Sequence, residues 1–142
     1  MFEAENLIRE AIERHGSRLG VACSFGKDSI VVLYMALKIN PNIKVLFENT
    51  GVEFPETIEY KNRLVREWNL NLIETYPIKS FWVCVKEYGL PGVRGRLKNR
   101  TPFCCLYCKE YPGIKAMREN NINAILTGLM GSESRQRKLL IL

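Results

Sequence analysis

Short apolar runs alternate with helix-like segments along most of this 142-residue chain. Strand-like runs that alternate with segments whose apolar residues recur every three or four positions predict a parallel sheet with right-handed crossovers. The expected fold class is therefore α/β, a doubly wound, mostly parallel sheet with helices on both faces. Strands are expected at 18–24, 43–49, 70–76, 122–128 and 138–142, and helices at 3–15, 29–39, 54–69, 80–89 and 105–120.

The size and composition of the chain predict one globular domain over residues 1–142. Hydrophobic residues make up 46% of the chain and charged residues 25%, an ordinary globular balance. No apolar run approaches the roughly 20 residues that span a bilayer, and the N-terminus is a charged amphipathic pattern rather than a signal peptide. We therefore expect a cytoplasmic protein without a membrane contact.

The positive charge is concentrated in the C-terminal part of the chain. Residues 91–142 hold ten Lys or Arg against three Glu, whereas residues 1–90 are nearly balanced. Such an excess favours a polyanion, including nucleic acid, or a phosphate-rich small molecule as partner. A solvated basic surface is the alternative interpretation.

Residues 24–29, Ser-Phe-Gly-Lys-Asp-Ser, form a small polar loop between an expected strand and an expected helix. Neither the Walker A motif nor the GxGxxG fingerprint is present in this turn. The loop still has the properties of an anion site, because Gly26 permits close backbone approach, Lys27 is cationic and a helix N-terminus attracts phosphate. Asp28 is a candidate Mg²⁺ ligand. Asp28 and Ser29 are equally compatible with a plain helix N-cap.

Five cysteines, an odd number, argue against a disulfide framework in a chain that we expect in the cytoplasm. Cys23 and Cys84 lie in apolar surroundings and are expected to be buried structural thiols. The close group Cys104, Cys105 and Cys108 favours thiol chemistry or metal binding instead. His15, the one histidine, is expected to lie at the surface where the first helix ends.

Four segments together resemble a known family. The 24–29 loop resembles the PP-loop, SxGxDS, of the N-type ATP pyrophosphatases, which belong to the adenine nucleotide alpha hydrolase-like, Rossmann-like folds. Residues 47–57, FENTGVEFPET, are similar to the DTGxxFPET signature of phosphoadenosine phosphosulfate (PAPS) reductases, and residues 127–137, TGLMGSESRQR, to their GxRxxESxxR segment. Residues 100–112 resemble the Cys-Cys element of iron-sulfur adenylyl-sulfate reductases.

The resemblance implies a nucleotide site assembled from these segments. The PP-loop would contact phosphates, the second strand would end beside the nucleotide with Glu53 and Phe54 framing the pocket, and Gly128 would approach the adenosine. The charged 133–137 segment would face the phosphate or sulfate, or else be a solvated charge run. The nucleotide-binding residues so implied are Ser24, Gly26, Lys27, Asp28, Ser29, Thr50, Gly51, Gly128, Glu133, Ser134, Arg135 and Arg137.

The chain departs from the family pattern at three places. Asp28 is typical of members that hydrolyse ATP and favours ATP-Mg²⁺ as ligand, and Asn49 stands where Asp is common. The reductases attack the sulfonucleotide with a cysteine in a C-terminal segment that this sequence lacks, so the chain is expected to be incomplete or minimal relative to the family. The catalytic nucleophile is unknown, with Cys104, Cys105 and Cys108 as candidate thiols.

The resemblance leaves the cofactor open. Three thiolates can hold a [4Fe–4S] cluster with one open iron, or a Zn²⁺ ion with a fourth ligand such as Cys84, and unligated thiols are the third possibility. Sulfonucleotide reduction to sulfite, with a thioredoxin-like electron donor and a possible homo-oligomer, is the first expectation for function. An adenylating ATP pyrophosphatase, acting on sulfate or on a nucleic-acid base destined for thiolation, is the second, and a non-catalytic nucleotide- or metal-binding module is the third.

Overall fold

The computed structural model describes residues 2–91 and 102–129 of the chain. A single four-stranded sheet in the order β3-β2-β1-β4 forms its centre, and each neighbouring pair of strands is parallel. The parallel α/β class is therefore confirmed, and the fifth expected strand, at 138–142, lies outside the described residues. The strands are β1 (Leu19–Ala22), β2 (Lys44–Glu48), β3 (Asn71–Thr75) and β4 (Ala124–Leu126).

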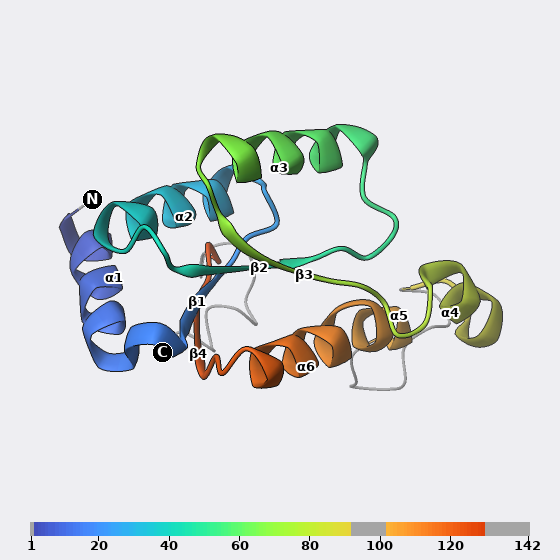
Figure 1. Cartoon of the computed structure of the whole chain (residues 1–142). Coiled ribbons are helices and arrows are strands. Elements are labelled where there is room, and N and C mark those ends of the chain that lie inside the picture. The colour runs from blue at the N-terminus through green and yellow to red at the C-terminus, as the bar shows by residue number, and fades with distance from the viewer. Residues whose placement is uncertain (1, 92–101, 130–142) are drawn as a thin grey trace.

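Helices cover both faces of the sheet, as expected for a doubly wound fold (Figure 1). α2 (Lys27–Ile39) and α3 (Pro55–Glu67) lie above the strands in this view, and α6 (Tyr111–Glu119) lies below them. α1 (Phe2–His15) packs beside α2 and β1, and a short 3₁₀ turn, η1 (Gly16–Arg18), leads from it into β1. The strand order runs outward from β1 to β3 and then returns to the other side of β1 with β4, so β1 and β4 border the point where ligands bind in open α/β sheets.

The core lies between the sheet and the α2 face. Val21 and Val45 are register partners on β1 and β2, and both are fully buried. Leu33 of α2 and Phe47 of β2 are equally inaccessible, and Ile43 precedes β2 in the same cluster. The apolar runs that predicted strands are thus the runs that fill the interior.

One long helical segment changes its winding in the middle. α5 (Phe103–Cys105) continues into a π-helix, η2 (Leu106–Glu110), and then into α6, and the amide of Tyr111 donates to the carbonyl of Leu106. The helix expected at 105–120 is therefore present, but it begins earlier and contains a π turn. Such turns are rare and occur frequently at functional sites.

Local sequence explains the remaining helix ends. Pro55 occupies the start of α3, where its missing amide hydrogen has no intrahelical role. Ser80 caps α4 (Phe81–Tyr88), its Oγ accepting from the amide of Val83 at 3.3 Å, and Gly89 ends this helix with a φ of 84°. α4 and α5 lie beyond one end of the sheet (Figure 1). Within the described residues, no helix has the length and apolar character needed to cross a bilayer.

Candidate functional site

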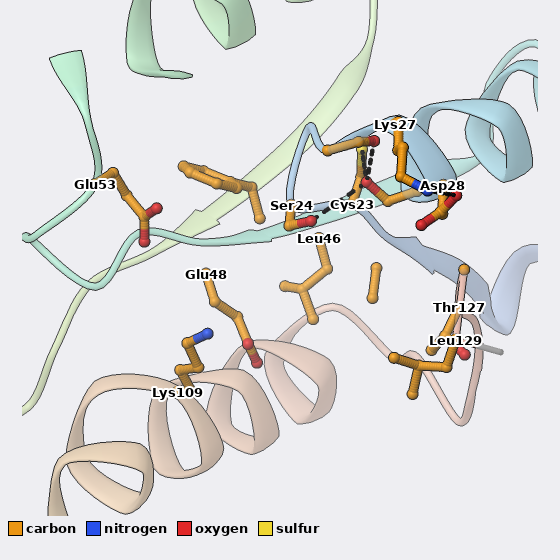
Figure 2. A pocket seen from close by; sticks show the side chains of 15 residues that line it. Cys23, Ser24, Lys27, Asp28, Leu46, Glu48, Glu53, Lys109, Thr127 and Leu129 are labelled. Atoms are coloured by element: carbon orange, nitrogen blue, oxygen red, sulfur yellow. Dashed lines mark hydrogen bonds and ion pairs between the residues drawn. The ribbon is translucent and has the colours of Figure 1, made fainter. Parts of the chain in front are cut away.

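A cavity of about 510 Å³ opens at the carboxyl ends of β1, β2 and β4. Figure 2 shows its walls: the 24–29 loop on one side, the end of β2 in the middle and the π-helical segment with the turn after β4 opposite. The site thus lies where the topology of the sheet predicts a ligand. The lining residues are Ala22, Cys23, Ser24, Gly26, Lys27, Asp28, Ser29, Leu46, Phe47, Glu48, Glu53, Lys109, Thr127, Gly128 and Leu129.

The 24–29 loop opens directly into α2. Gly26 is the N-cap residue of this 13-residue helix, and its carbonyl accepts from the amide of Ile30 at 3.0 Å. Ser29 Oγ donates to the same carbonyl at 3.0 Å, so Ser29 lies within the first turn and does not cap it. No side chain of the described residues caps α2. The simple N-cap interpretation of Asp28 and Ser29 is therefore wrong, and the first amides of α2 remain available to an anion.

Hydroxyl and thiol groups gather beneath the loop. Ser24 Oγ and Ser29 Oγ lie 3.3 Å apart, and Cys23 Sγ lies 3.6 Å from Ser29 Oγ. Burial raises the pKa of the Cys23 thiol, although hydrogen bonds with Phe25 and Ser29 oppose the rise. Cys23 is therefore a buried neutral thiol, as expected from the sequence, and a weak nucleophile.

Phe25 holds the loop in an unusual conformation. Its backbone adopts a φ of 57°, a region that aromatic residues rarely occupy. Its ring is buried and packs edge-to-face on Phe47, with centroids 5.4 Å apart. Packing against β2 therefore offsets the backbone strain and turns the polar side chains of the loop toward the cavity.

Lys27 and Asp28 carry the charges of the loop. Lys27 Nζ lies 3.1 Å from Asp28 Oδ1, and the Lys27 side chain is 90% exposed. An exposed pair of this kind contributes little energy. Lys27 is consequently free to exchange Asp28 for a phosphate oxygen without a large penalty.

The turn after β2 is held by hydrogen bonds with neighbouring side chains. Thr50 is buried, and its Oγ1 donates to Glu53 Oε1 at 2.7 Å. Asn49 Oδ1 accepts from the amide of Gly51 at 3.0 Å, and Gly51 adopts a φ of 77°. Thr50 and Gly51, expected at the nucleotide, lie behind the rim and not among the lining residues, while Glu53 lines the cavity. Phe54, expected to frame the pocket, is exposed and also outside the lining.

Asn49 is part of a half-buried network. Its Nδ2 donates to Glu74 Oε1 at 2.8 Å, and Lys61 Nζ donates to Glu74 Oε2 at 2.7 Å. Burial alone would raise the pKa of Glu74, but the hydrogen bonds from Lys61 and Asn49 outweigh it and hold the pKa below its usual value. An amide at position 49 can donate to this carboxylate and an aspartate could not, which explains the departure from the family motif.

Gly128 closes the cavity against the loop. A Cβ at this position would lie 2.9 Å from the backbone carbon of Asp28 and from the nitrogen of Ser29. Only glycine lets the turn after β4 approach the start of α2 so closely. Gly128 was expected near the adenosine, and the structure places it on the cavity wall in direct contact with the PP-loop backbone.

Two further charged residues line the cavity, and neither was identified from the sequence. Glu48 is the last residue of β2, and Lys109 lies on η2; both side chains point into the cavity in Figure 2. Burial raises the pKa of Glu48, opposed by the nearby Lys109 and reinforced by Glu110. The available signal was a charged residue at the carboxyl end of a buried strand in a parallel sheet.

The cysteines lie apart from the cavity, except for Cys23. Cys84 Sγ and Cys108 Sγ both donate to the carbonyl of Lys79, at 3.8 and 3.5 Å. Burial, with Cys84 and Cys104 nearby, raises the pKa of Cys108 to about 11. Burial of Cys84 agrees with expectation. Cys104 and Cys105 are half-buried on α5.

The described cysteines do not form a ready metal site. Across residues 2–91 and 102–129, no group of three or more His, Cys, Asp or Glu has an arrangement that could hold a metal ion. Cys84, Cys104 and Cys105 all lie close enough to Cys108 to raise its pKa, and an iron-sulfur cluster or zinc ion on Cys104, Cys105 and Cys108 stays a prediction. The expected anion-binding residues Glu133, Ser134, Arg135 and Arg137 lie outside the described residues.

A solved structure shares the fold. The crystal structure of phosphoadenylyl-sulfate (PAPS) reductase from Candida auris, a phosphate complex, matches with a TM-score of 0.66 at 21% identity. The match covers 89% of this chain and 60% of that one. At this identity the likeness establishes the fold alone.

Several curated relatives are similar in sequence. The adenosine 5'-phosphosulfate reductase of a Chelativorans species is 33% identical over 80% of this chain and 46% of its own length. The phosphoadenosine 5'-phosphosulfate reductase of Photobacterium profundum is 30% identical over 96% of this chain and 53% of its own length. An uncharacterized protein of Methanocaldococcus jannaschii is 34% identical over 87% of the chain and 25% of its own length. The chain thus spans about half the length of the curated reductases it matches.

The family model agrees with these relatives. The model of the phosphoadenosine phosphosulfate reductase domain matches residues 18–141, nearly the whole chain. The match includes the 24–29 loop, the end of β2 and the turn after β4, which together line the cavity. The chain therefore belongs to the phosphoadenosine phosphosulfate reductase domain family.

Proposed function

We propose that this domain binds an adenine sulfonucleotide, adenylyl sulfate or PAPS, in the cavity and takes part in its reduction to sulfite. The observation that carries the proposal is the uncapped start of α2, which faces a cavity at the switch point of the sheet. Family membership and the reductase names of the relatives support the same activity.

The phosphate end of the ligand is assigned to the 24–29 loop. The dipole of α2 and its free first amides favour an anion there, and Ser24 and Ser29 add hydroxyl donors. Lys27 is exposed at the rim and can neutralise charge that develops on the phosphate. Gly26 lets the backbone approach the ligand, because its position is unobstructed except for Ser24 Oγ.

The reduction itself needs a thiolate. In the proposed reaction a thiolate attacks the sulfur of the sulfonucleotide, the bond from sulfur to the phosphate oxygen breaks and the nucleotide leaves. A dithiol donor of the thioredoxin class then releases sulfite from the resulting thiosulfonate and is itself oxidised to a disulfide, which supplies the two electrons. Cys104, Cys105 and Cys108 stay the candidate thiols of this chain, although none of them lines the cavity formed by the described residues.

ATP-dependent adenylation is the second candidate. Asp28 lines the cavity beside the helix start, and its side chain is 39% exposed, so a Mg²⁺ ion bridging to phosphates could reach it. Sulfate or a nucleic-acid base would then be the acceptor, in line with the basic C-terminal part of the chain. This candidate ranks below the reductase because the matched relatives carry reductase names.

Metal on the cysteines stays a prediction outside the proposed reaction. The described residues contain no preformed metal-binding group, and no step of the proposed reaction passes through iron-sulfur or zinc. Elemental analysis of anaerobically purified protein tests the prediction directly, with an absorption band near 400 nm marking iron-sulfur.

Calorimetric titration with adenylyl sulfate, PAPS and ATP-Mg²⁺ in parallel tests the function. We expect a sulfonucleotide to bind more tightly than ATP-Mg²⁺, and Lys27→Ala to weaken it. Lys38→Ala is the matched control, because Lys38 is an exposed lysine at the other end of α2. Preference for ATP-Mg²⁺ that is lost in Asp28→Asn would support adenylation, and no binding by any nucleotide would overturn the phosphate role of the loop.

A further inference from the structure

Glu48 has a carboxylate in the cavity that no other group satisfies. It is the last residue of β2, its side chain is half-buried, and it points into the cavity from the sheet (Figure 2). Within the described residues, neither of its oxygens takes part in a hydrogen bond or an ion pair, and its pKa is governed by burial and by nearby charges alone. A half-buried carboxylate without partners is unfavourable in the absence of a ligand.

Three other carboxylates at this end of the sheet have partners among the described residues. Glu53 accepts from Thr50 Oγ1 at 2.7 Å, and Glu74 accepts from Lys61 and Asn49. Asp28 lies 3.1 Å from Lys27 Nζ. Glu48 differs from these three in that neither of its oxygens has a hydrogen-bond or ion-pair partner in the described part of the chain, and it lines the cavity.

The Glu48 carboxylate packs against the backbone of α6 at Gly113. A Cβ on Gly113 would lie 2.5 Å from Glu48 Oε1, so the carboxylate fits there only because this helix position has no side chain. Lys109 and Glu110 are the charged groups of the neighbouring η2 segment that act on it, with opposite effects on its pKa. No bonded cation among the described residues neutralises it, so the carboxylate is suited to uncharged donors of a ligand.

The position of Glu48 indicates which part of a nucleotide it meets. In dinucleotide-binding Rossmann folds, which hold a pyrophosphate at the helix after the first strand, an acid about 20 residues farther along the chain binds the ribose 2'-hydroxyl, and Glu48 lies at a comparable distance from Gly26. β1 leads to the phosphate loop here, and β2, which ends at Glu48, is its neighbour in the sheet. The PP-loop and Glu48 line one cavity, with the loop on one wall and the acid on the next.

We propose that Glu48 recognises the nucleoside part of the ligand by accepting hydrogen bonds from its ribose hydroxyls while the 24–29 loop holds the phosphate. This inference rests on the proposed nucleotide site and deepens it. A 3'-phosphate would bring further negative charge to a carboxylate that has no ion-pair partner among the described residues and only the nearby Lys109 as a counter-charge, so we expect the site to favour nucleotides with a free 2',3'-diol. Adenylyl sulfate is then preferred over its 3'-phosphorylated counterpart.

Binding of AMP, its 2'-deoxy and 3'-deoxy analogues, adenosine 3',5'-bisphosphate and inorganic pyrophosphate to wild type and Glu48→Gln tests the proposal. We expect Glu48→Gln to weaken the binding of AMP roughly tenfold, because the loss of a hydrogen bond to a charged group usually lowers affinity by about this factor. Pyrophosphate should bind equally well or more tightly, and the preference for AMP over the bisphosphate should fall. At least one deoxy analogue should bind wild type more weakly than AMP does. In Glu48→Gln this analogue and AMP should bind with equal affinity.

Two further variants separate recognition from general effects. Glu119→Gln removes the same charge from an exposed position of α6 outside the cavity, so AMP binding should not fall. Gly113→Ala leaves the Glu48 carboxylate in the protein but displaces it from its position. The binding of AMP should therefore weaken, while the binding of pyrophosphate should not change.

The outcomes are distinguishable from failure of the nucleotide site itself. AMP binding that is unchanged or tighter in Glu48→Gln, or equal losses of AMP and pyrophosphate, would overturn the role of Glu48 and leave the phosphate loop intact. Deoxy analogues that bind wild type as well as AMP would also overturn it. If wild type binds neither AMP nor pyrophosphate, the proposed nucleotide site falls and this inference falls with it.

Discussion

Lys61 Nζ lies 2.7 Å from Glu74 Oε2, with only 5% of the lysine side chain and 18% of the glutamate exposed. This ion pair joins α3 to β3 beside the turn that follows β2. Removal of one partner from a buried pair leaves an uncompensated charge, so Lys61→Ala should lower the free energy of unfolding by roughly 3 kcal/mol. Urea denaturation measures the loss. Lys115→Ala is the control, because the Lys115–Glu119 pair is exposed and its loss should cost well under about 1 kcal/mol.

The same network predicts a pH dependence for Glu74. Its pKa is lowered in the folded state, because the hydrogen bonds from Lys61 and Asn49 outweigh burial. Its ionised form therefore contributes stability that is present above the ordinary glutamate pKa of about 4.3 and is lost as the pH falls below it. Glu74→Gln should be less stable than wild type at pH 7, and the difference should shrink in denaturation curves recorded below about pH 4. A difference that is constant with pH would contradict this assignment.

Asn49→Asp should destabilise the domain even though aspartate is common at this position in the family. The substitution replaces the donor that lies 2.8 Å from Glu74 Oε1 with a second carboxylate. We expect a loss of about 1–3 kcal/mol in unfolding free energy at pH 7. In a Glu74→Gln background the repulsion is absent, so Asn49→Asp should cost much less stability than it does in wild type. An equal cost in the two backgrounds would show that the two side chains are not coupled.

Glu48→Gln should make the unliganded domain more stable at neutral pH. Burial raises the folded-state pKa of Glu48, so its ionisation opposes folding. Protonated Glu48 contributes stability that is fully present below the ordinary glutamate pKa of the unfolded chain. This stability is lost as the pH rises through the higher pKa that Glu48 has in the folded state. The variant should therefore exceed wild type in thermal stability at pH 7 and match it near pH 4. A less stable variant at pH 7 would mean that Glu48 is well solvated or paired.

Gly128→Ala should damage both the fold and the phosphate site. The added Cβ would meet the backbone of Asp28 and Ser29 at 2.9 Å, and backbone at a helix start cannot easily move. We expect a loss of about 1–3 kcal/mol, as for other overpacked sites, and weaker pyrophosphate binding. Gly26→Ala is the steric control for stability, because its Cβ would make only ordinary contact with Ser24 Oγ. Equal stability of Gly128→Ala and wild type would show that the two turns move apart freely.

The fold could be predicted because its signals are local. Apolar runs such as 43–49 correspond to strands, and glycine, proline and serine mark the helix ends at Gly89, Pro55 and Ser80. The PP-loop was recognisable because its chemistry depends on six adjacent residues. Its placement at the cavity follows from topology, which the alternation of strands and helices already implied.

The parts that escaped prediction depend on tertiary contacts. Lys61 and Glu74 appear in the sequence as ordinary surface charges of a helix and a strand, and only their packing makes them a buried pair. The role of Asn49 depends on Glu74, which lies far along the chain. The π turn at Leu106–Glu110 has no local composition signal, since its residues are compatible with a regular helix. Glu48 belongs to a predicted strand, and its relation to Gly113 is visible only when α6 packs on the sheet.

The pairing of β1 with β4 also has a consequence for how the protein forms during synthesis. Leu19 is in register with Ala124, so β1 pairs with a strand that is synthesised about 100 residues later. β2 and β3 can assemble on β1 as they leave the ribosome, but one edge of β1 stays open until residues 124–126 emerge. Contacts of such high sequence separation slow folding and leave an edge exposed to wrong partners. Because Gly128 lies two residues after β4, the cavity is completed only after the four-stranded sheet, and a nascent chain that stalls before this glycine has a sheet but no closed pocket.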